Sequence, residues 1–246
     1  MTERWVILAD THFPLVHLPT WGVALELIKD LNARVLFQGD QFHNDEISHH
    51  NASKPAFAPM GIYRKNQEAF DNQILKPLEA ATSSPKVWII GNHDEWEREY
   101  IDSFPHLEGM IERPQTLHLA DRGWEIIPVG HSKSLGDLKV IHGEMFNGAT
   151  SLKRAVDVYG KVLKAHTHSP EQFTKVAPVD QPEKHRGWTS PILGMVNPHY
   201  LRNKPTAWSN GVTLVEIHDG IADVFPLVLT NGKVSYAGKI YGLSGT

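Results

Sequence analysis

The chain has 246 residues, of which 41% are hydrophobic and 21% are charged, a composition typical of a folded globular protein and too apolar for a disordered one. The 24 basic and 28 acidic residues leave a formal net charge of −4, which excludes a surface that binds polyanions without selectivity. The absence of cysteine excludes disulfides, thiolate metal ligands and cysteine nucleophiles, and it fits a reducing environment.

Short apolar runs alternate with helical stretches in the first half of the chain. Strands are predicted over residues 4–9, 34–37 and 86–90, helices over residues 20–31 and 61–81, and an exposed, proline-punctuated loop over residues 43–59. This alternation is typical of parallel strands joined by helical crossovers, and it predicts an α/β fold.

Predicted strands dominate the second half of the chain. They cover residues 124–129, 138–142, 162–166, 172–176, 212–217 and 221–229, with one helix over residues 150–159. The pairs Asp219-Gly220 and Asn231-Gly232 predict two-residue turns, which would make residues 212–237 an antiparallel meander. Because no repeat or composition break divides the chain, we expect residues 1–246 to form a single domain.

Polar side chains follow the predicted strands at five places. These segments are Asp10-Thr11-His12, Gly39-Asp40, Gly91-Asn92-His93-Asp94, His142-Gly143 and His166-Thr167-His168. Side chains at the carboxyl ends of such strands converge at one edge of an α/β sheet, and residues i and i+2 of an extended segment point the same way. Because the segments offer nitrogen and oxygen donors, the pattern predicts a metal site.

Each segment taken alone also has a structural explanation. Asp10 and Asp40 are suited to cap the helices that follow them, Asn92 is suited to hold a turn, and the histidines are suited to the core. Five segments in this order, each after an apolar strand, favour the metal site over the separate explanations.

The five segments together resemble the signature of the calcineurin-like metallophosphoesterase superfamily: DxH, GD, GNHD or GNHE, an H often followed by G, and GHxH. The resemblance extends from Asp10 to His168, with Ala165 in place of the usual glycine before the last pair. It implies an α/β fold in the form of a four-layer αββα sandwich, with two mixed sheets flanked by helices and completed by the C-terminal antiparallel meander.

The resemblance also implies two divalent metal ions. Matched position by position, Asp10, His12 and His168 hold one ion, Asn92, His142 and His166 hold the other, and Asp40 bridges both. Residue chemistry supports a similar division, because a carboxylate is the natural bridge between two cations and a neutral Asn oxygen limits the negative charge. Oxygen and imidazole donors without thiolate favour Mn²⁺, with Fe, Zn, Ni, Co and Mg as alternatives.

Such a metal pair activates a bridging hydroxide as the nucleophile for in-line displacement at phosphorus. The resemblance gives His93 the role of the acid that protonates the leaving oxygen or stabilises the pentavalent phosphorus. We expect the neighbouring Asp94 to fix the tautomer and orientation of the His93 ring, while simple packing against the sheet is the alternative for His93.

Two further segments bear on the substrate. Residues 39–45 (GDQFHND) resemble the GDLFH of the superfamily's DNA-repair nucleases, which implies that His43 lies near the scissile phosphate and favours diesters; a polar loop residue is the alternative. Residues 197–211 are similar to a segment of compact phage and bacterial metallophosphoesterases. Tyr200 and Trp208 in this segment offer flat faces suited to stacking a base, although a tryptophan beside a strand also suits the core.

These patterns predict a phosphodiesterase that hydrolyses nucleotide-type phosphodiesters, cyclic or linear. The alternatives are a phosphomonoesterase or protein phosphatase, and an interaction protein that keeps the fold without turnover. The expected partners are a small phosphodiester or nucleotide and short single-stranded nucleic acid. Without an export signal or a long apolar run we expect no membrane contact and a cytoplasmic location, the host cytoplasm for a phage-encoded chain. The oligomeric state is left open.

Overall fold

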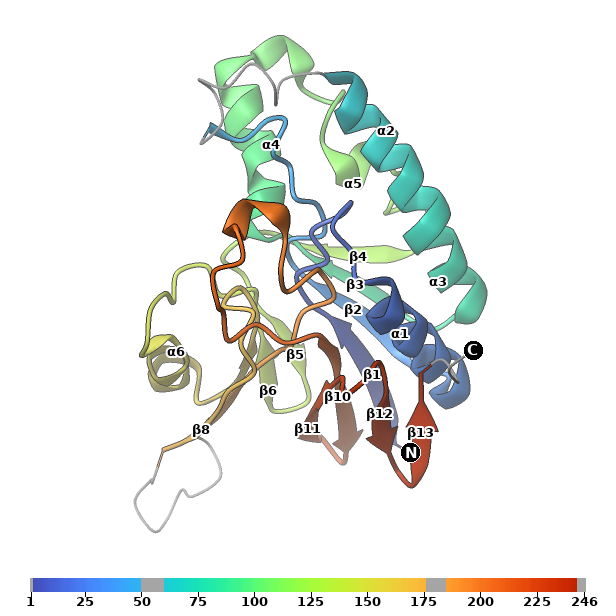
Figure 1. The fold of residues 1–246 in the computed structure, drawn as a ribbon, viewed down its shortest axis with the longest axis vertical. Coiled ribbons are helices and arrows are strands. Elements are labelled where there is room, and N and C mark those ends of the chain that lie inside the picture. Colours follow the sequence, from blue (N-terminus) through green and yellow to red (C-terminus); the bar gives the residue numbers. More distant parts are fainter. Residues whose placement is uncertain (1, 50–59, 176–184, 243–246) are drawn as a thin grey trace.

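The computed structural model describes residues 2–49, 60–175 and 185–242. Two large mixed β-sheets pack face to face, helices cover their outer faces, and a small antiparallel sheet near the C-terminus completes the fold (Figure 1). The predicted αββα sandwich is therefore confirmed.

The first sheet carries six strands. In spatial order they are β11 (Ile221–Val228), β10 (Gly211–His218), β1 (Glu3–Leu8), β2 (Arg34–Gln38), β3 (Lys86–Ile89) and β4 (Trp124–Ile127). Strands β1 to β4 run parallel, whereas β10 and β11 form an antiparallel hairpin at one edge. The carboxyl ends of β1, β2 and β3 therefore point toward the same rim of the sheet.

The second sheet carries five strands. In spatial order they are β5 (Lys133–Leu135), β6 (Leu138–Val140), β7 (Lys161–Lys164), β9 (Arg186–Thr189) and β8 (Gln172–Thr174). The central strands β6, β7 and β9 are parallel, and the two edge strands are antiparallel to their neighbours. A separate hairpin of β12 (Val234–Tyr236) and β13 (Lys239–Tyr241) forms the small sheet.

Helices cover both outer faces of the sandwich. Helix α1 (Leu18–Leu31) and the continuous run of α2 (Met60–Phe70), a π-helical turn η3 (Asp71–Leu75) and α3 (Lys76–Ala81) lie on the first sheet, and α6 (Ser151–Tyr159) lies on the second (Figure 1). The remaining helical segments are α4 (Asn92–Ser103), η4 (Pro105–Leu107), α5 (Arg113–Thr116) and η5 (His199–Leu201). Within the described residues, no helix combines the length and apolarity needed to cross a membrane.

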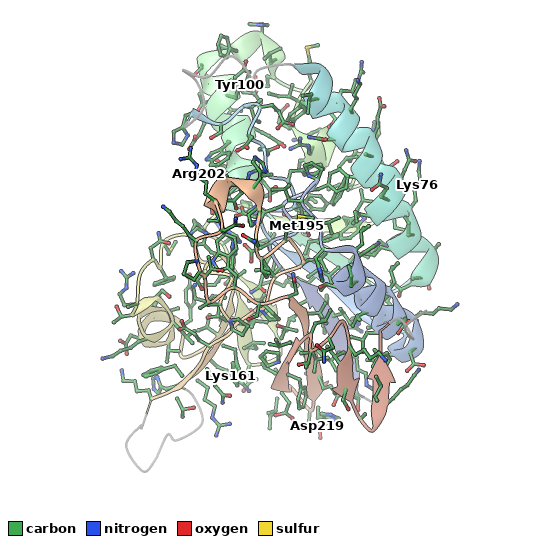
Figure 2. All side chains as sticks on the ribbon, in the orientation of Figure 1. Lys76, Tyr100, Lys161, Met195, Arg202 and Asp219 are labelled. Atoms are coloured by element: carbon green, nitrogen blue, oxygen red, sulfur yellow. The ribbon has the colours of Figure 1, made fainter. Side chains whose placement is uncertain are left out.

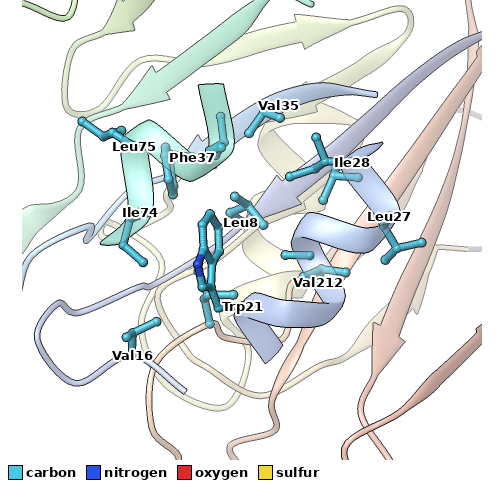
Figure 3. Close-up of a cluster of buried hydrophobic side chains, with 14 of the residues drawn as sticks. Leu8, Val16, Trp21, Leu27, Ile28, Val35, Phe37, Ile74, Leu75 and Val212 are labelled. Carbon is cyan, nitrogen blue, oxygen red and sulfur yellow. The ribbon is translucent and has the colours of Figure 1, made fainter. Parts of the chain in front are cut away.

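Alternating side chains of the central strands fill two separate cores. On β1, Val6 and Leu8 face the helices, whereas Trp5 and Ile7 face the second sheet. Figure 3 shows the helix side of this arrangement, where Trp21 of α1 packs beside strand residues such as Leu8. Because β1 is buried on both faces, its sequence is a continuous apolar run instead of an alternating one.

Most of the predicted elements are confirmed, with shifted ends, including the helices over residues 20–31, 61–81 and 150–159. The elements that were not predicted are helices α4 and α5, the helical turns η4 and η5, and strands β5, β9 and β13. In the predicted loop 43–59, residues 50–59 lie outside the described residues, as does residue 176 of the strand predicted over 172–176.

The predicted meander is wrong in its third strand. The turn at Asp219-Gly220 joins β10 to β11 with the expected positive φ angles of 50° and 82°. The predicted turn at Asn231-Gly232 also forms, with φ angles of 51° and 73° and a bridge between Thr230 and Lys233. Strand β12 nevertheless pairs with β13 instead of β11, because a further left-handed turn at Ala237-Gly238, with φ angles of 49° and 78°, closes a competing hairpin.

Helix α6 packs so closely on β9 that the strand needs a glycine at the contact. A Cβ atom on Gly187 would lie 2.5 Å from Val156 Cγ2 and 2.8 Å from Leu152 Cδ1. Gly187→Ala should therefore lower the free energy of unfolding by about 1–3 kcal/mol in urea denaturation. The control Gly22→Ala should raise it by about 0.5–1 kcal/mol, because a Cβ added in α1 meets no described atom within 4 Å. An unchanged stability for Gly187→Ala would contradict this packing.

Candidate metal centre

Five of the seven candidate donor residues have a left-handed backbone conformation. The φ angles are 50° at Asp10, 47° at His12, 53° at Asp40, 69° at His166 and 61° at His168. Such angles cost about 1–3 kcal/mol at residues other than glycine and cluster at functional sites. Hydrogen bonds between the loops hold them, including His12 N to Asp40 O at 2.9 Å and Gly194 N to Asp10 O at 2.9 Å. The loops therefore fix the directions of the donor side chains.

Asp10, His12 and His168 form one donor group, and all three side chains are buried. Their potential ligand atoms all lie within 4.8 Å of one another. His168 Nε2 is 3.3 Å from Asp10 Oδ1 and 3.1 Å from His12 Nε2. The group joins the end of β1 to the loop that follows β7.

Asp40, His142 and His166 form the second donor group, with the same 4.8 Å limit between ligand atoms. His142 Nε2 lies 3.3 Å from Asp40 Oδ2 and 3.0 Å from Asn92 Oδ1, so Asn92 adjoins this group. The other ring nitrogen, Nδ1, donates to the carbonyl oxygen of Gln38 at 2.9 Å. This bond leaves Nε2 of a neutral His142 as the nitrogen with a free lone pair.

The Asp40 carboxylate lies between the two groups. Its Oδ2 is 3.3 Å from His142 Nε2 and 4.0 Å from His12 Nε2, and its Oδ1 accepts a hydrogen bond from His93 N at 2.9 Å. The other six side chains predicted to bind metal therefore lie around this carboxylate.

The protonation of the centre suits divalent cations. Burial lowers the pKa of His12 well below its usual value, and burial with the nearby His142 lowers the pKa of His166 to about 4. For His142, burial is outweighed by the Asp40 carboxylate, which raises its pKa to about 10, so a cation would displace this proton. The buried Oδ1 of Asp10 accepts no hydrogen bond from the described residues. Neutral imidazoles and buried carboxylates are the donor set of a transition-metal site.

His93 lies beside these groups, near the start of α4. Its ring centroid is 4.8 Å from that of His12, and its Nδ1 donates to the carbonyl oxygen of His43 at 2.8 Å. Burial lowers the pKa of His93, and Asp40 partly opposes this effect. A neutral His93 therefore carries its proton on Nδ1 and has a free lone pair on Nε2.

The expectation that Asp94 orients the His93 ring is wrong. Its carboxylate accepts backbone N–H groups from Gly91 at 3.0 Å, Phe42 at 3.3 Å and Gln41 at 3.4 Å. Asp94 sits at the third position of α4, where a carboxylate naturally reaches back to the residue before the helix. It therefore joins residues 41–42 to the helix terminus, and the His43 carbonyl orients the His93 ring.

The three predicted substrate-binding residues also lie at the centre. His43 is 9% exposed and stacks between His93, with ring centroids 5.4 Å apart, and Tyr200, with centroids 5.2 Å apart. The half-buried Trp208 packs edge-on against His168 at 4.3 Å, which places it at the centre and outside the hydrophobic core clusters. Arg202, labelled in Figure 2, follows Tyr200 on the same connection between β9 and β10.

Four residues that support the centre were not predicted. The side chain of Gln38 donates to the carbonyls of Ile141 and Leu163, Asn147 Oδ1 lies 2.7 Å from His166 Nε2, Asn44 donates to the carbonyl of His93, and Lys164 is buried next to the last motif. Gln38 and Lys164 carried a visible signal, since each is a polar residue that ends an apolar strand.

The fold and the paired donor groups place the protein in a known class. The sequence model of the calcineurin-like phosphoesterase family matches residues 4–203. The chain belongs to this family, as its motifs predict. No curated protein sequence matches the chain.

The solved structures that match this protein share little sequence identity with it. An archaeal phosphodiesterase is 17% identical, with a TM-score of 0.43 over 92% of this chain and 99% of that one. The zinc complex of Vps29 from Entamoeba histolytica is 13% identical, with a TM-score of 0.45 over 94% and 96%. The phosphoesterase Yfce from E. coli is 15% identical, with a TM-score of 0.42 over 92% and 97%.

Lys164 predicts a specific dependence of stability on pH. Its fully buried ammonium donates to Ala165 O at 2.9 Å and Thr167 Oγ1 at 3.2 Å, and burial lowers its pKa to about 8 although Asp10 opposes this. The folded chain loses this proton near pH 8, whereas the unfolded chain keeps it to higher pH. The contribution of Lys164 to the free energy of unfolding therefore increases as the pH rises above 8.

We expect the following in urea denaturation of the metal-free protein. Between pH 8 and pH 10 the free energy of unfolding of the wild type should rise by about 2 kcal/mol relative to that of Lys164→Met. The control Lys153→Met removes an exposed lysine of α6 and should keep the wild-type slope. Equal slopes for the wild type and Lys164→Met would show that this lysine is charged in the fold.

Proposed function

We propose that the protein is a dinuclear metal-dependent phosphodiesterase that hydrolyses nucleotide-type phosphodiesters. The observation that carries this proposal is the position of the Asp40 carboxylate between two donor groups, with His93 held beside it. Two divalent cations, Mn²⁺ in first place for these oxygen and imidazole donors, would supply an activated water and neutralise charge on the phosphate.

The residues of the chain have distinct tasks in this reaction. Asp10, His12 and His168 would hold one cation, Asn92, His142 and His166 the other, and Asp40 both. His93 presents Nε2 because its Nδ1 is bound to the His43 carbonyl. As an imidazolium it can therefore pass the Nε2 proton to the leaving oxygen, while the Nδ1 bond keeps the ring in place.

The surroundings of His93 support a diester over a monoester. Its neighbours include the rings of His12, His43 and Trp96, and Tyr200 stacks on His43. A diester carries two organic substituents, and these rings offer flat apolar faces on which the second substituent can pack. This supports assigning the substrate to the diester class.

Tyr200 supports a nucleotide as the substituent. Its side chain stacks on His43 with an interplanar angle of 12°, yet the residue is 42% exposed, so part of its surface is open to a base. Base stacking on an exposed aromatic ring contributes about 1–3 kcal/mol. Exposed Arg202 and Lys204 follow on the same segment and suit a phosphate or a short single strand of nucleic acid.

The cysteine-free composition supports a cytoplasmic location for this activity.

The first test is hydrolysis by Asp40→Asn. The variant should lose at least about 100- to 1,000-fold in kcat/KM with Mn²⁺, because a neutral amide cannot replace the shared carboxylate. The control Asp223→Asn changes an exposed carboxylate on β11 and should behave as wild type. Full turnover by Asp40→Asn would refute the proposed centre.

The substrate class is tested by comparing bis-para-nitrophenyl phosphate with para-nitrophenyl phosphate on wild-type protein. We expect a higher kcat/KM for the diester. The reverse preference would make the protein a phosphomonoesterase, and a folded, metal-loaded protein that hydrolyses neither would be an interaction protein.

The base-stacking role of Tyr200 predicts a change in substrate affinity. Tyr200→Ala should raise KM for a dinucleotide or cyclic nucleotide by about tenfold, the equivalent of one stacked base, with a smaller effect on kcat. The control Tyr200→Phe keeps the flat ring and should keep the wild-type KM. A wild-type KM for Tyr200→Ala would place the base elsewhere.

A further inference from the structure

A buried arginine, Arg113, is linked to His93 through the side chain of Asn44. Arg113, the first residue of α5, is 1% exposed, and its guanidinium carbon lies 3.5 Å from the ring centroid of Phe42 and 3.9 Å from that of Tyr63. A buried charge is costly unless it is paired and hydrogen-bonded. Arg113 is paired with Glu97 of α4, whose Oε1 accepts from Nη1 at 2.8 Å and whose Oε2 accepts from the backbone N–H at 2.9 Å. Its Nε and Nη2 are buried and have no hydrogen-bond partner among the described residues.

The same guanidinium also holds Asn44. Nη1 of Arg113 donates to the Asn44 side-chain oxygen. An amide whose oxygen is held must turn its NH₂ group the opposite way. The Asn44 NH₂ group accordingly donates to the carbonyl oxygen of His93 at 2.8 Å. Asn44 has a φ angle of 56°, a left-handed conformation that asparagine tolerates better than most residues.

Residues 43 and 44 therefore hold His93 at two points. The Asn44 side chain fixes the backbone of His93, and the His43 carbonyl fixes its ring through Nδ1 at 2.8 Å. The backbone of His93 is also bound from the other side, where its N–H donates to Asp40 Oδ1 at 2.9 Å. Any shift of the 43–44 segment would therefore move the His93 ring relative to Asp40.

We propose that Arg113 is a positioning residue for hydrolysis: through Asn44 it fixes the segment that sets the orientation and tautomer of His93. This role rests on the proposed function, in which His93 serves the leaving oxygen. Arg113 itself touches none of the donor groups through the contacts that the described residues make.

The chemistry of this position requires arginine. The guanidinium is planar, so it stacks between two rings while one nitrogen bonds to both Glu97 and Asn44. A lysine ammonium keeps the charge but has neither the flat faces nor the fixed donor direction. Misplacing a catalytic group by about 1 Å can cost about 100-fold in rate. The conservative change to lysine should therefore be visible in turnover.

The experiment compares Arg113→Lys and Asn44→Ala with the matched control Arg122→Lys. Arg122 is also an arginine held by carboxylates, Asp71 and Glu79, but it is half-buried, and both partners lie on the helical run that covers the first sheet. Arg113→Lys and Asn44→Ala should each lower kcat by about 10- to 100-fold, with KM and bound metal at wild-type levels. Arg122→Lys should keep the wild-type kcat even if it lowers the melting temperature.

The double variant separates this coupling from general destabilisation. If Arg113 acts through Asn44, Arg113→Lys combined with Asn44→Ala should lose no more kcat than either single variant. Multiplied losses, or a loss of bound metal that parallels the loss of kcat, would overturn the proposal. Since Asn44→Ala leaves the Arg113–Glu97 pair in place, it tests the same link if Arg113→Lys does not fold.

A readout that needs no turnover is the ¹⁵N spectrum of the His93 ring in zinc-loaded protein. The wild type should show a proton on Nδ1, and Arg113→Lys and Asn44→Ala should show a mixture of tautomers. An unchanged His93 spectrum in both variants would overturn the positioning role. If the wild type hydrolyses no phosphodiester but its variants change the spectrum, the proposed function fails while the structural link to His93 stands.

Discussion

The centre depends on hydrogen bonds that tie the two sheets together at the rim where the donor side chains emerge. Gln38, the last residue of β2, reaches across the interface and donates to the carbonyls of Ile141 at 2.9 Å and Leu163 at 3.0 Å, while its Oε1 accepts from Ser190 at 2.6 Å. The apolar contacts between the sheets have no directional preference, whereas these three bonds fix one position. Because both donor groups take side chains from both sheets, the spacing within each group depends on this position.

The rim combines this rigid base with loops in costly backbone conformations. Asp10, Asp40 and His166 have positive φ angles, and each makes at least one backbone hydrogen bond with another loop of the rim or with a side chain there. The Asp40 loop is also bound by Asp94, whose carboxylate joins it to the start of α4. The packing of the sandwich core therefore offsets the free-energy cost of these strained residues.

The sequence allowed the strands and the donor residues to be predicted because both leave local signals: apolar runs, and polar motifs directly after them. Helix α4 could not be predicted, since its sequence NHDEWEREYIDS has few apolar positions and its start is fixed by contacts of Asp94 with the backbone of Gln41 and Phe42, which are distant in the sequence. Gln38 and Arg113 were missed because their partners lie up to 152 and 69 residues away. Asp94 was placed at the right site with the wrong partner, because a motif specifies neighbours in sequence and not the direction of a side chain.

The division of each donor group between two sheets links cation binding to the integrity of the whole sandwich. Neither sheet alone carries a complete group, since His168, His142 and His166 come from the second sheet and their carboxylate partners from the first. A bound ion would connect the two sheets, and its binding free energy would add to the free energy of unfolding. Scarcity of metal in the cell would then reduce the amount of intact protein as well as its activity.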